Sequence, residues 1–263
     1  MDIIENLSGF TKSFGKWRGD EKLAGYPFVE NVHTPFTPLR RALPMMNLAL
    51  ITSAGAHIDG TDPFDIESRD GDVSFREIPI EIEAADLLYS ARGFDVKAVQ
   101  QDRNVLIPID RLREYQDNGV IGKLNNVWWS ISSYTPNAQH VAEDLAPKLA
   151  ARLVRYEINA ALLIPASRLC HQTMGIIARH LEHNGIPTTL ISVDKSIAER
   201  VRAPRTSYYD GDIGSTVGPP DFPQFQLRVL DETLRNMETF DQPGARKLTV
   251  HMESDVEAGR GER

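Results

Sequence analysis

Two short, continuously apolar runs in the second half of the chain constrain the fold most strongly. They are AALLIP (residues 160–165) and TTLISV (188–193), and an amphipathic pattern over 172–183 lies between them. Continuous apolar runs are typical of strands that are buried on both faces of a sheet. Another amphipathic stretch, 141–157, precedes the first run. Strands and helices that alternate at this spacing predict βαβ units and a parallel sheet.

The first half of the chain supplies further apolar runs with turn signals between them. Strands or extended segments are predicted at 47–53, 73–82, 86–91 and 104–109, and helices at 111–118 (with Asp110 as its N-cap), 194–202 and 224–240. The sequence therefore predicts an α/β fold with a Rossmann-like parallel sheet and helices on both faces, and it leaves open whether the fold has two similar halves.

Composition divides the chain into three parts. Residues 1–45 carry prolines and aromatic residues with weak periodicity, so we expect an N-terminal arm. Residues 46–240 hold the alternating pattern of the α/β domain. Residues 241–263 are polar and rich in Gly, Arg and Glu, which predicts a flexible C-terminal tail.

Charge and cysteine content exclude several function classes. The net charge is −8 and no long basic run is present, so a nucleic-acid partner is not expected. No apolar stretch approaches the ~20 residues of a membrane span, and the N-terminus lacks the order of a signal peptide. We therefore expect a cytoplasmic protein. A single cysteine allows neither an internal disulfide nor a Cys-based zinc site, and no spacing of other residues predicts a metal site.

The one cysteine, Cys170, lies where the apolar run 160–165 gives way to the amphipathic pattern. In an open α/β sheet, ligands bind beyond the carboxyl ends of the strands. The N–H groups at a helix start are unpaired and the helix dipole is positive there, which lowers the pKa of a thiol. A lone cysteine is more often a small buried hydrophobe. Two interpretations of Cys170 thus stay open, a reactive thiol and an inert core residue.

The neighbours of Cys170 extend this candidate site. Ser167 precedes it by three residues, so Ser-x-x-Cys matches a Cys-x-x-Cys redox motif without its first thiol. A serine here is also a common helix N-cap, and that use is the more frequent one. His171 could add positive charge or act as an acid or base. Gln172 and Thr173 could offer hydrogen bonds to a substrate.

The end of the run 47–53 supplies the remaining candidates. Small residues there, including Thr52, Ser53 and Gly55, let a ligand approach the backbone closely. His57 could reach the same crevice as Cys170 and move protons, although a lone histidine is more often structural. We expect substrate contacts from Thr52, Ser53 and Gly55, and catalysis from His57 together with the residues around Cys170.

Several stretches together resemble a known family. They are LALITSAGAHI, DPFDIESRDGDVSFREIP, DRNVLIPIDRLREYQDNGVIG, AALLIPASRLCHQTMGIIARHLEHNGIPTTLIS and GSTVGPPDFPQFQLRVL. In this combination and order they resemble the selenoprotein B family of glycine, sarcosine, betaine and D-proline reductases, in particular the shorter D-proline-reductase-like branch. The resemblance runs over residues 47–231.

The resemblance implies reductive cleavage of a carbon–nitrogen bond. In the family, a selenocysteine or cysteine at the position of Ser167 attacks the substrate, the thiol at the position of Cys170 closes the bond to it, and a dithiol restores both. This chain departs from that pattern at Ser167, whose hydroxyl has no redox chemistry. It departs again at Ala91, where relatives have a histidine that could act as an acid, base or ligand.

The expected function is therefore that of a reductase-like enzyme that cleaves a carbon–heteroatom bond of a small amino-acid-like substrate through Cys170. No bound cofactor is expected, and an external dithiol would be the reductant. A second copy of the chain or a reductase partner subunit is the expected protein partner. Two alternatives remain open: a non-catalytic binding or scaffold subunit, and a non-redox lyase or hydrolase that uses the same pocket.

Overall fold

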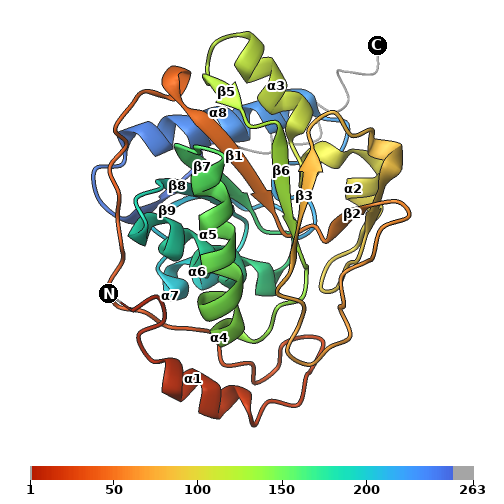
Figure 1. Cartoon of the computed structure of the whole chain (residues 1–263), viewed down its shortest axis with the longest axis vertical. Helices are drawn as coiled ribbons and strands as arrows, with labels where there is room; N and C mark the ends of the chain where they lie inside the picture. Colours follow the sequence, from red (N-terminus) through yellow and green to blue (C-terminus); the bar gives the residue numbers. More distant parts are fainter. Residues whose placement is uncertain (1, 251–263) are drawn as a thin grey trace.

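The computed structural model describes residues 2–250, which form a central sheet with helices on both sides (Figure 1). The strands are β1 Asn47–Thr52, β2 Ala56–Ile58, β3 Phe75–Pro79, β4 Leu87–Tyr89, β5 Lys123–Leu124, β6 Val127–Ile131, β7 Ala160–Ile164, β8 Thr188–Ser192, β9 Arg205–Tyr208 and β10 Gly244–Lys247. The helices are α1 Leu7–Phe14, α2 Lys97–Gln101, α3 Ile109–Asp117, α4 Ala138–His140, α5 Ala146–Arg155, α6 Arg168–His183, α7 Lys195–Val201 and α8 Pro223–Thr239.

The main sheet has the order β10-β9-β8-β7-β1-β6-β3, and β5 also pairs with β1. Its strands are parallel except for β3, which runs antiparallel to β6. The predicted α/β class with a mostly parallel, helix-flanked sheet is thus confirmed. The chain leaves β1 toward β6 and leaves β7 toward β8, so the connections diverge between β1 and β7. Such a switch point places a crevice at the carboxyl ends of these two strands.

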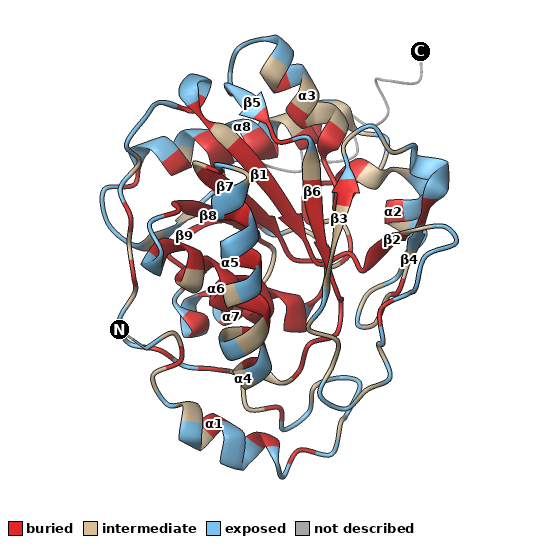
Figure 2. Ribbon diagram, viewed as in Figure 1, coloured by how far each residue is buried: buried red, intermediate tan, exposed pale blue. Residues whose placement is uncertain are grey.

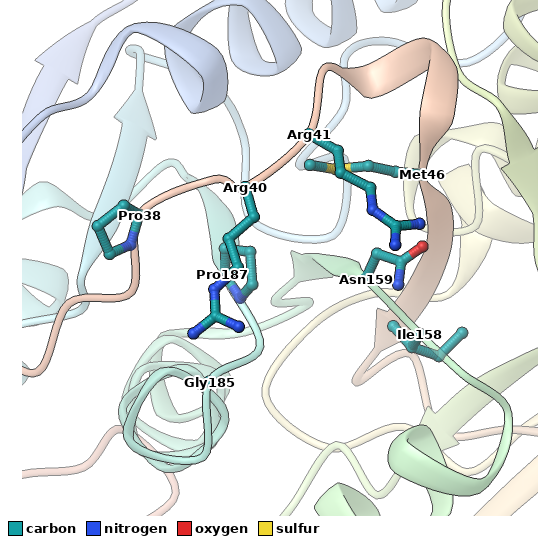
Figure 3. Close-up of a pocket in the computed structure, with 8 residues that line it drawn as sticks. All are labelled: Pro38, Arg40, Arg41, Met46, Ile158, Asn159, Gly185 and Pro187. Carbon is teal, nitrogen blue, oxygen red and sulfur yellow. The ribbon is translucent and has the colours of Figure 1, made fainter.

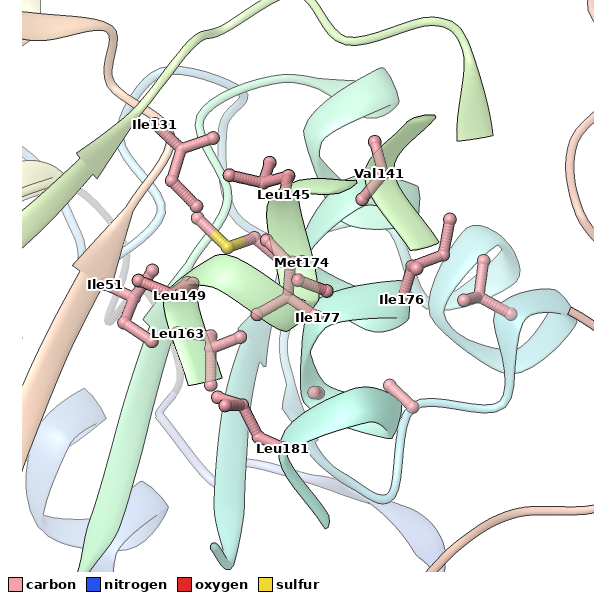
Figure 4. Packing of buried hydrophobic residues seen from close by; sticks show 14 of the residues in the cluster. Ile51, Ile131, Val141, Leu145, Leu149, Leu163, Met174, Ile176, Ile177 and Leu181 are labelled. Atoms are coloured by element: carbon pink, nitrogen blue, oxygen red, sulfur yellow. The ribbon is translucent and has the colours of Figure 1, made fainter. Parts of the chain in front are cut away.

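Alternation along the strands gives each face of the sheet its own core. Ala49 and Ile51 of β1 face the cluster beneath α4–α7, whereas Leu48 and Leu50 face the cluster beneath α3 and α8. Figure 4 shows Ile51 of β1 and Leu163 of β7 packed against Leu149 and Met174. The central strands β1, β6, β7 and β8 are almost wholly buried, and the outer helices expose their far sides (Figure 2). Within residues 2–250, no helix combines the length and the apolar character that crossing a membrane needs.

Residues 104–109 do not form the predicted strand. Val105 ends the 3-10 turn Arg103–Val105, and Ile109 begins α3, although both side chains are fully buried. Pro108 lies in the middle of this run and lacks the N–H that a central strand must donate. The Asp110 carboxylate lies in the first turn of α3 and accepts hydrogen bonds from Arg103. Burial of this run was therefore predicted correctly, and its secondary structure was not.

The predicted flexible tail is wrong for its first residues. Residues 244–247 form β10, which pairs with β9 in parallel, and Leu248 and Val250 are buried in the core beneath α8. The polar residues of β10 are compatible with a strand because β10 lies at the edge of the sheet and one of its faces is exposed. Residues 251–263 of the predicted tail lie outside the described part of the chain.

The N-terminal arm is bound to the domain by buried polar side chains. Glu182 of α6 and Arg205 of β9 form a fully buried ion pair. The Glu182 carboxylate also accepts the backbone N–H groups of Thr37 (2.5 Å) and Thr188 (2.7 Å), and Arg205 donates to the Thr37 carbonyl oxygen (2.6 Å). A buried charge is tolerated where partners offset its desolvation, as they do here for the carboxylate and for both terminal guanidinium nitrogens, while the Arg205 Nε has no hydrogen-bond partner among the described residues. The pair therefore fixes the arm at Thr37.

The ion pair gives a stability prediction. Glu182→Gln removes the carboxylate and leaves the Arg205 charge buried without its partner, which should lower the free energy of unfolding by about 3–5 kcal/mol. Asp144→Asn is the matched control, because it breaks the exposed Lys148–Asp144 pair and should cost at most about 1 kcal/mol. Urea unfolding curves measure both, and equal losses for the two variants would contradict this account of the arm.

Candidate functional site

A cavity of about 310 Å³, called the site cavity below, lies at the carboxyl end of the sheet. Its lining comes from the arm (Glu21, Lys22, Leu23), from the loop after β4 (Arg92, Gly93), from the segment after β6 (Tyr134) and from the start of α6 (Ser167, Arg168, Leu169). The ends of β1, β6 and β7 meet here because these strands are parallel neighbours. The cavity thus occupies the place where an open α/β sheet binds ligands.

The start of α6 brings Ser167 to this cavity. α6 begins at Arg168, four residues before the predicted start, and Ser167 is its N-cap. The Ser167 Oγ accepts the Cys170 backbone N–H (3.2 Å) and donates to the Cys170 Sγ (3.1 Å). The capping role predicted for Ser167 is confirmed, and its contact with the sulfur is an addition to that role.

The Cys170 thiol is enclosed behind Ser167. Cys170 is 1% exposed. Its Sγ donates a hydrogen bond to the Ser133 carbonyl oxygen at 3.3 Å and lies 3.8 Å from the Ser53 carbonyl oxygen. Burial raises the pKa of the thiol, although the hydrogen bonds from Ser167 act against this. The expected lowering of this pKa is therefore wrong, because desolvation outweighs the helix start.

His171 does not reach the site cavity. Its ring is fully buried, with Nδ1 2.7 Å from the Ser167 carbonyl oxygen. Its Nε2 accepts the backbone N–H groups of Val193 (3.2 Å) and Asp194 (3.3 Å), so the proton is assigned to Nδ1. Burial lowers the pKa of His171 to about 4. The ring stays neutral and joins α6 to the end of β8, which is a structural role in place of the predicted acid–base role.

The other residues predicted beside Cys170 bind protein groups. Gln172 accepts the Val29 backbone N–H (2.7 Å) and donates to the Tyr26 hydroxyl (2.6 Å), so it holds the arm. The Thr173 hydroxyl pairs with that of Thr135 at 2.6 Å, behind the site cavity. Neither side chain lines the cavity.

Thr52, which ends β1, and Ser53 and Gly55 after it contact backbone atoms and do not line the site cavity. The Ser53 Oγ accepts the Ala166 N–H (3.0 Å) across the switch point, and the Thr52 Oγ1 lies 3.3 Å from the Ala54 nitrogen. Gly55 has φ +65°, and a Cβ there would lie 2.2 Å from the Ser90 carbonyl oxygen, so the close approach requires glycine.

His57 lies in β2 opposite Leu88 and is nearly buried, with Nδ1 3.4 Å from the Gly55 carbonyl oxygen. It does not line the site cavity. Of the residues that the sequence predicted as catalytic, the structure thus brings Ser167 and Cys170 together and leaves His57 and His171 apart from the cavity.

Sequence reasoning missed Arg92 and Gly93. The Arg92 guanidinium stacks 3.9 Å above the Tyr134 ring and donates to the Ile66 carbonyl oxygen (2.8 Å), while its backbone N–H donates to the Ser133 Oγ (2.8 Å). Gly93 has φ +89°, and a Cβ there would lie 3.2 Å from the Ser167 Cβ. The sequence did carry one signal for them: both directly follow Ala91, a position at which this chain differs from the family that it resembles.

The His171 environment predicts an acid-sensitive fold. An unfolded histidine titrates near pH 6.5, whereas His171 in the fold has a pKa of about 4. Between these values the unfolded chain takes up a proton that the folded chain does not, so stability falls as the pH drops through this window, by on the order of 3 kcal/mol. Unfolding free energies measured from pH 7 to pH 4 should show a shallower fall for His171→Gln than for His140→Gln, a change at an exposed histidine. If stability falls with pH equally steeply in both variants, His171 is not the source of the acid sensitivity.

Residues 16–166 match the family model described as glycine/sarcosine/betaine reductase selenoprotein B (GRDB), and the match ends one residue before Ser167. No solved structure matches the chain.

Curated relatives agree with this match. The chain is 28% identical to "D-proline reductase subunit gamma" of Acetoanaerobium sticklandii, over 80% of this chain and 85% of that protein. It is 24% identical to "Glycine reductase complex component B subunit gamma" of Symbiobacterium thermophilum, over 83% of this chain and 51% of that protein. The chain thus covers most of the first relative and about half of the second. Because the family model covers more than half of the chain, the chain belongs to the glycine/sarcosine/betaine reductase selenoprotein B family.

Proposed function

We propose that the chain binds a small amino-acid-like molecule in the site cavity and cleaves a carbon–nitrogen bond of it reductively, with Cys170 as the reacting thiol. The observation that carries the proposal is the 3.1 Å contact between the Cys170 Sγ and the Oγ of Ser167, which lines the cavity. The relatives are named as components of D-proline and glycine reductases, which supports a role in the same class of reaction.

The charges of the cavity suit an amino-acid-like ligand. Lys22 and Arg92 bring positive charge to its lining and Glu21 brings negative charge, while the charge of Arg168, which also lines the cavity, is paired with Asp194. Ser167 begins α6, where the helix dipole also favours an anionic group. A carboxylate would lie toward the two cations and the helix start, and an amino group toward Glu21. The volume of about 310 Å³ is at the small end of the usual range for ligand sites.

The proposed chemistry balances with an external dithiol. The Cys170 sulfur forms a bond to the substrate carbon as the carbon–nitrogen bond breaks, and the amine leaves with the thiol proton. One thiol of the reductant then attacks the Cys170 sulfur and forms a mixed disulfide, while the carbon leaves with the electron pair and takes up a proton. The second thiol of the reductant displaces Cys170, which regains its proton as the reductant becomes a disulfide.

The burial of the thiol sets conditions on this reaction. The thiolate is the nucleophile, and burial raises the pKa of Cys170, so turnover should increase with pH in the alkaline range. The Ser167 hydroxyl donates to the Sγ and would stabilise the thiolate once it forms. We place the reaction in the cytoplasm, where dithiol reductants are maintained, with a second copy of the chain or a reductase subunit as the protein partner.

A second candidate is a ligand-binding subunit without turnover. The observation that favours it is the complete enclosure of the Cys170 thiol between backbone carbonyl oxygens and Ser167. In this case the ligand would occupy the same cavity and a partner subunit would supply any chemistry.

Turnover separates the two candidates. Purified chain with excess dithiothreitol should act on one of the compounds that the relatives' names suggest. It should either open the ring of D-proline to an open-chain amino acid that keeps the nitrogen, or release ammonia, methylamine or trimethylamine from glycine, sarcosine or betaine. Cys170→Ala should lower the rate at least about a hundredfold, because no other thiol exists in the chain. Ser13→Ala, an exposed change on α1, is the control that should leave the rate unchanged. Turnover that survives Cys170→Ala would exclude the thiol mechanism, and ligand binding without turnover would favour the second candidate.

A second thiol at the N-cap provides an independent test. Ser167→Cys would place two sulfurs at neighbouring positions in the order that the family resemblance implies. Oxidation of this variant should form an internal disulfide, seen by mass spectrometry as the loss of two hydrogens and of all alkylatable thiol. Dithiol-dependent turnover should increase over that of the unchanged chain. If the two cysteines stay reduced under conditions that oxidise free cysteine, the proposed approach of positions 167 and 170 is wrong.

A further inference from the structure

A second cavity lies at the opposite end of the sheet from Cys170. It has a volume of about 210 Å³ and lies beside the amino ends of β1, β7 and β8 (Figure 3). Its lining is Pro38, Arg40, Arg41, Met46, Ile158, Asn159, Gly185 and Pro187. Two of these residues are cations, and none of the described residues in the lining is acidic. On a chain whose net charge is −8, this is a local reversal of charge.

We propose that this cavity binds a tetrahedral oxyanion, free or as the phosphoryl group of a small molecule, between the guanidinium groups of Arg40 and Arg41. Neither guanidinium has a hydrogen-bond or ion-pair partner among residues 2–250. Arginine pairs with phosphate through several N–H donors at once, and two unpaired guanidinium groups on one cavity would repel each other without an anion between them.

The geometry favours a tetrahedral anion over a carboxylate. Figure 3 shows the Arg40 side chain extending toward Gly185 and Pro187, and the Arg41 side chain extending toward Asn159. The two guanidinium groups therefore approach from different sides. A carboxylate presents its two oxygens in one plane, whereas phosphate presents oxygens in several directions and can meet both donors.

Asn159 supplies a third donor. Its Oδ1 accepts the Asn47 backbone N–H at 3.0 Å, which orients the amide. Its Nδ2 donates to no atom of the described residues, although the side chain lines the cavity. Figure 3 shows the amide beside the Arg41 guanidinium, with its oxygen on the Arg41 side and its nitrogen on the far side, so the Nδ2 would bind a different oxygen of the anion from the one that Arg41 binds.

The backbone that carries the two arginines is fixed on both sides. Thr37 is bound by Glu182, and the Leu43 N–H donates to the Glu238 carboxylate at 3.1 Å. The short segment between these points therefore presents Arg40 and Arg41 from an anchored loop, which lowers the entropy lost when they bind an anion.

The size of the cavity limits the ligand and indicates where the rest of it would lie. A volume of about 210 Å³ is below the usual range for drug-sized ligands, so the group held here is compact. A wider hollow of about 660 Å³ adjoins it and shares Arg41, Met46 and Asn159. Lys123 and Glu157 both line that hollow, so it holds one further cation and one anion. The organic part of a phosphate monoester would extend in that direction.

Calorimetry in chloride buffer of constant ionic strength tests the proposal, with inorganic phosphate, glycerol 3-phosphate and acetate as probes. Phosphate should bind at one site, and Arg40→Ala and Arg41→Ala should each weaken it at least about tenfold. Arg18→Ala removes an exposed arginine elsewhere on the arm and should change the affinity less than twofold. Glycerol 3-phosphate binding more tightly than phosphate would indicate a phosphate monoester as the ligand, and equal affinity would indicate the free ion.

Three results would overturn the proposal: no binding of either phosphate compound, affinities unaffected by both arginine variants, or acetate binding as tightly as phosphate. The cations of the site cavity are the other plausible anion site, so Lys22→Ala is included. Loss of phosphate binding in Lys22→Ala with retention in Arg40→Ala would place the anion at the Cys170 end and contradict the assignment. Because Arg40 and Arg41 are both exposed, these variants are expected to fold, and their unfolding midpoints check this.

Discussion

The structure depends on the burial of polar side chains along α6. This helix packs against the sheet on one side and beneath the N-terminal arm on the other, so most of the polar residues in its interior turns are removed from water. Gln172, Arg179 and Glu182 each bind backbone groups of the arm: Val29 for Gln172, Ile3 and His33 for Arg179, and Thr37 for Glu182. Without the arm, the polar groups of these three side chains would either stay buried without hydrogen-bond partners or become exposed together with the apolar surface around them. Both alternatives raise the free energy of the fold.

The same contacts build the site cavity. The arm that α6 holds at Val29 and Thr37 also carries Glu21, Lys22 and Leu23 to the start of α6, where they face Ser167. The opposite wall comes from the loop after β4, whose Arg92 N–H binds the Ser133 side chain, while the Ser133 carbonyl oxygen accepts the Cys170 thiol. Hydroxyl groups and carbonyl oxygens thus surround the sulfur, and charged side chains lie outside them. This separation keeps the thiol protonated at rest and keeps the charges where a ligand would meet them.

The sequence predicted those parts of the fold that depend on local pattern. The strands at 47–53, 160–165 and 188–193 and the helix 224–240 follow from apolar periodicity, and the structure confirms each of them within two residues. The pattern failed at 104–109, where Pro108 turns a buried run into helical turns, and at β10, where pairing with β9 makes a strand from polar residues. At 104–109 the missing N–H of Pro108 decided the secondary structure, and at β10 a strand partner distant in the sequence decided it.

The site was predictable only in part for the same reason. The position of Ser167 and Cys170 at a helix start follows from the order of strand and helix, but the enclosure of the thiol depends on Ser53 and Ser133, which come from two other strand ends. His171 and Gln172 look like site residues because they adjoin Cys170. A helix turns adjacent side chains in different directions, and these two face β8 and the arm.

The arm contacts also order the events of folding. Thr37 and its partner Glu182 are 145 residues apart in the chain, and Asp2 and Arg179 are 177 apart. During synthesis the arm is made before its buried anchors in α6 and β9, so until those elements form it can contact only earlier residues such as Arg69 and Pro136. Contacts between such distant segments form slowly, after local ones. Phe10 and Phe14 of α1 are buried in the folded protein, so in a nascent chain they would stay accessible to a chaperone until the arm closes on the domain.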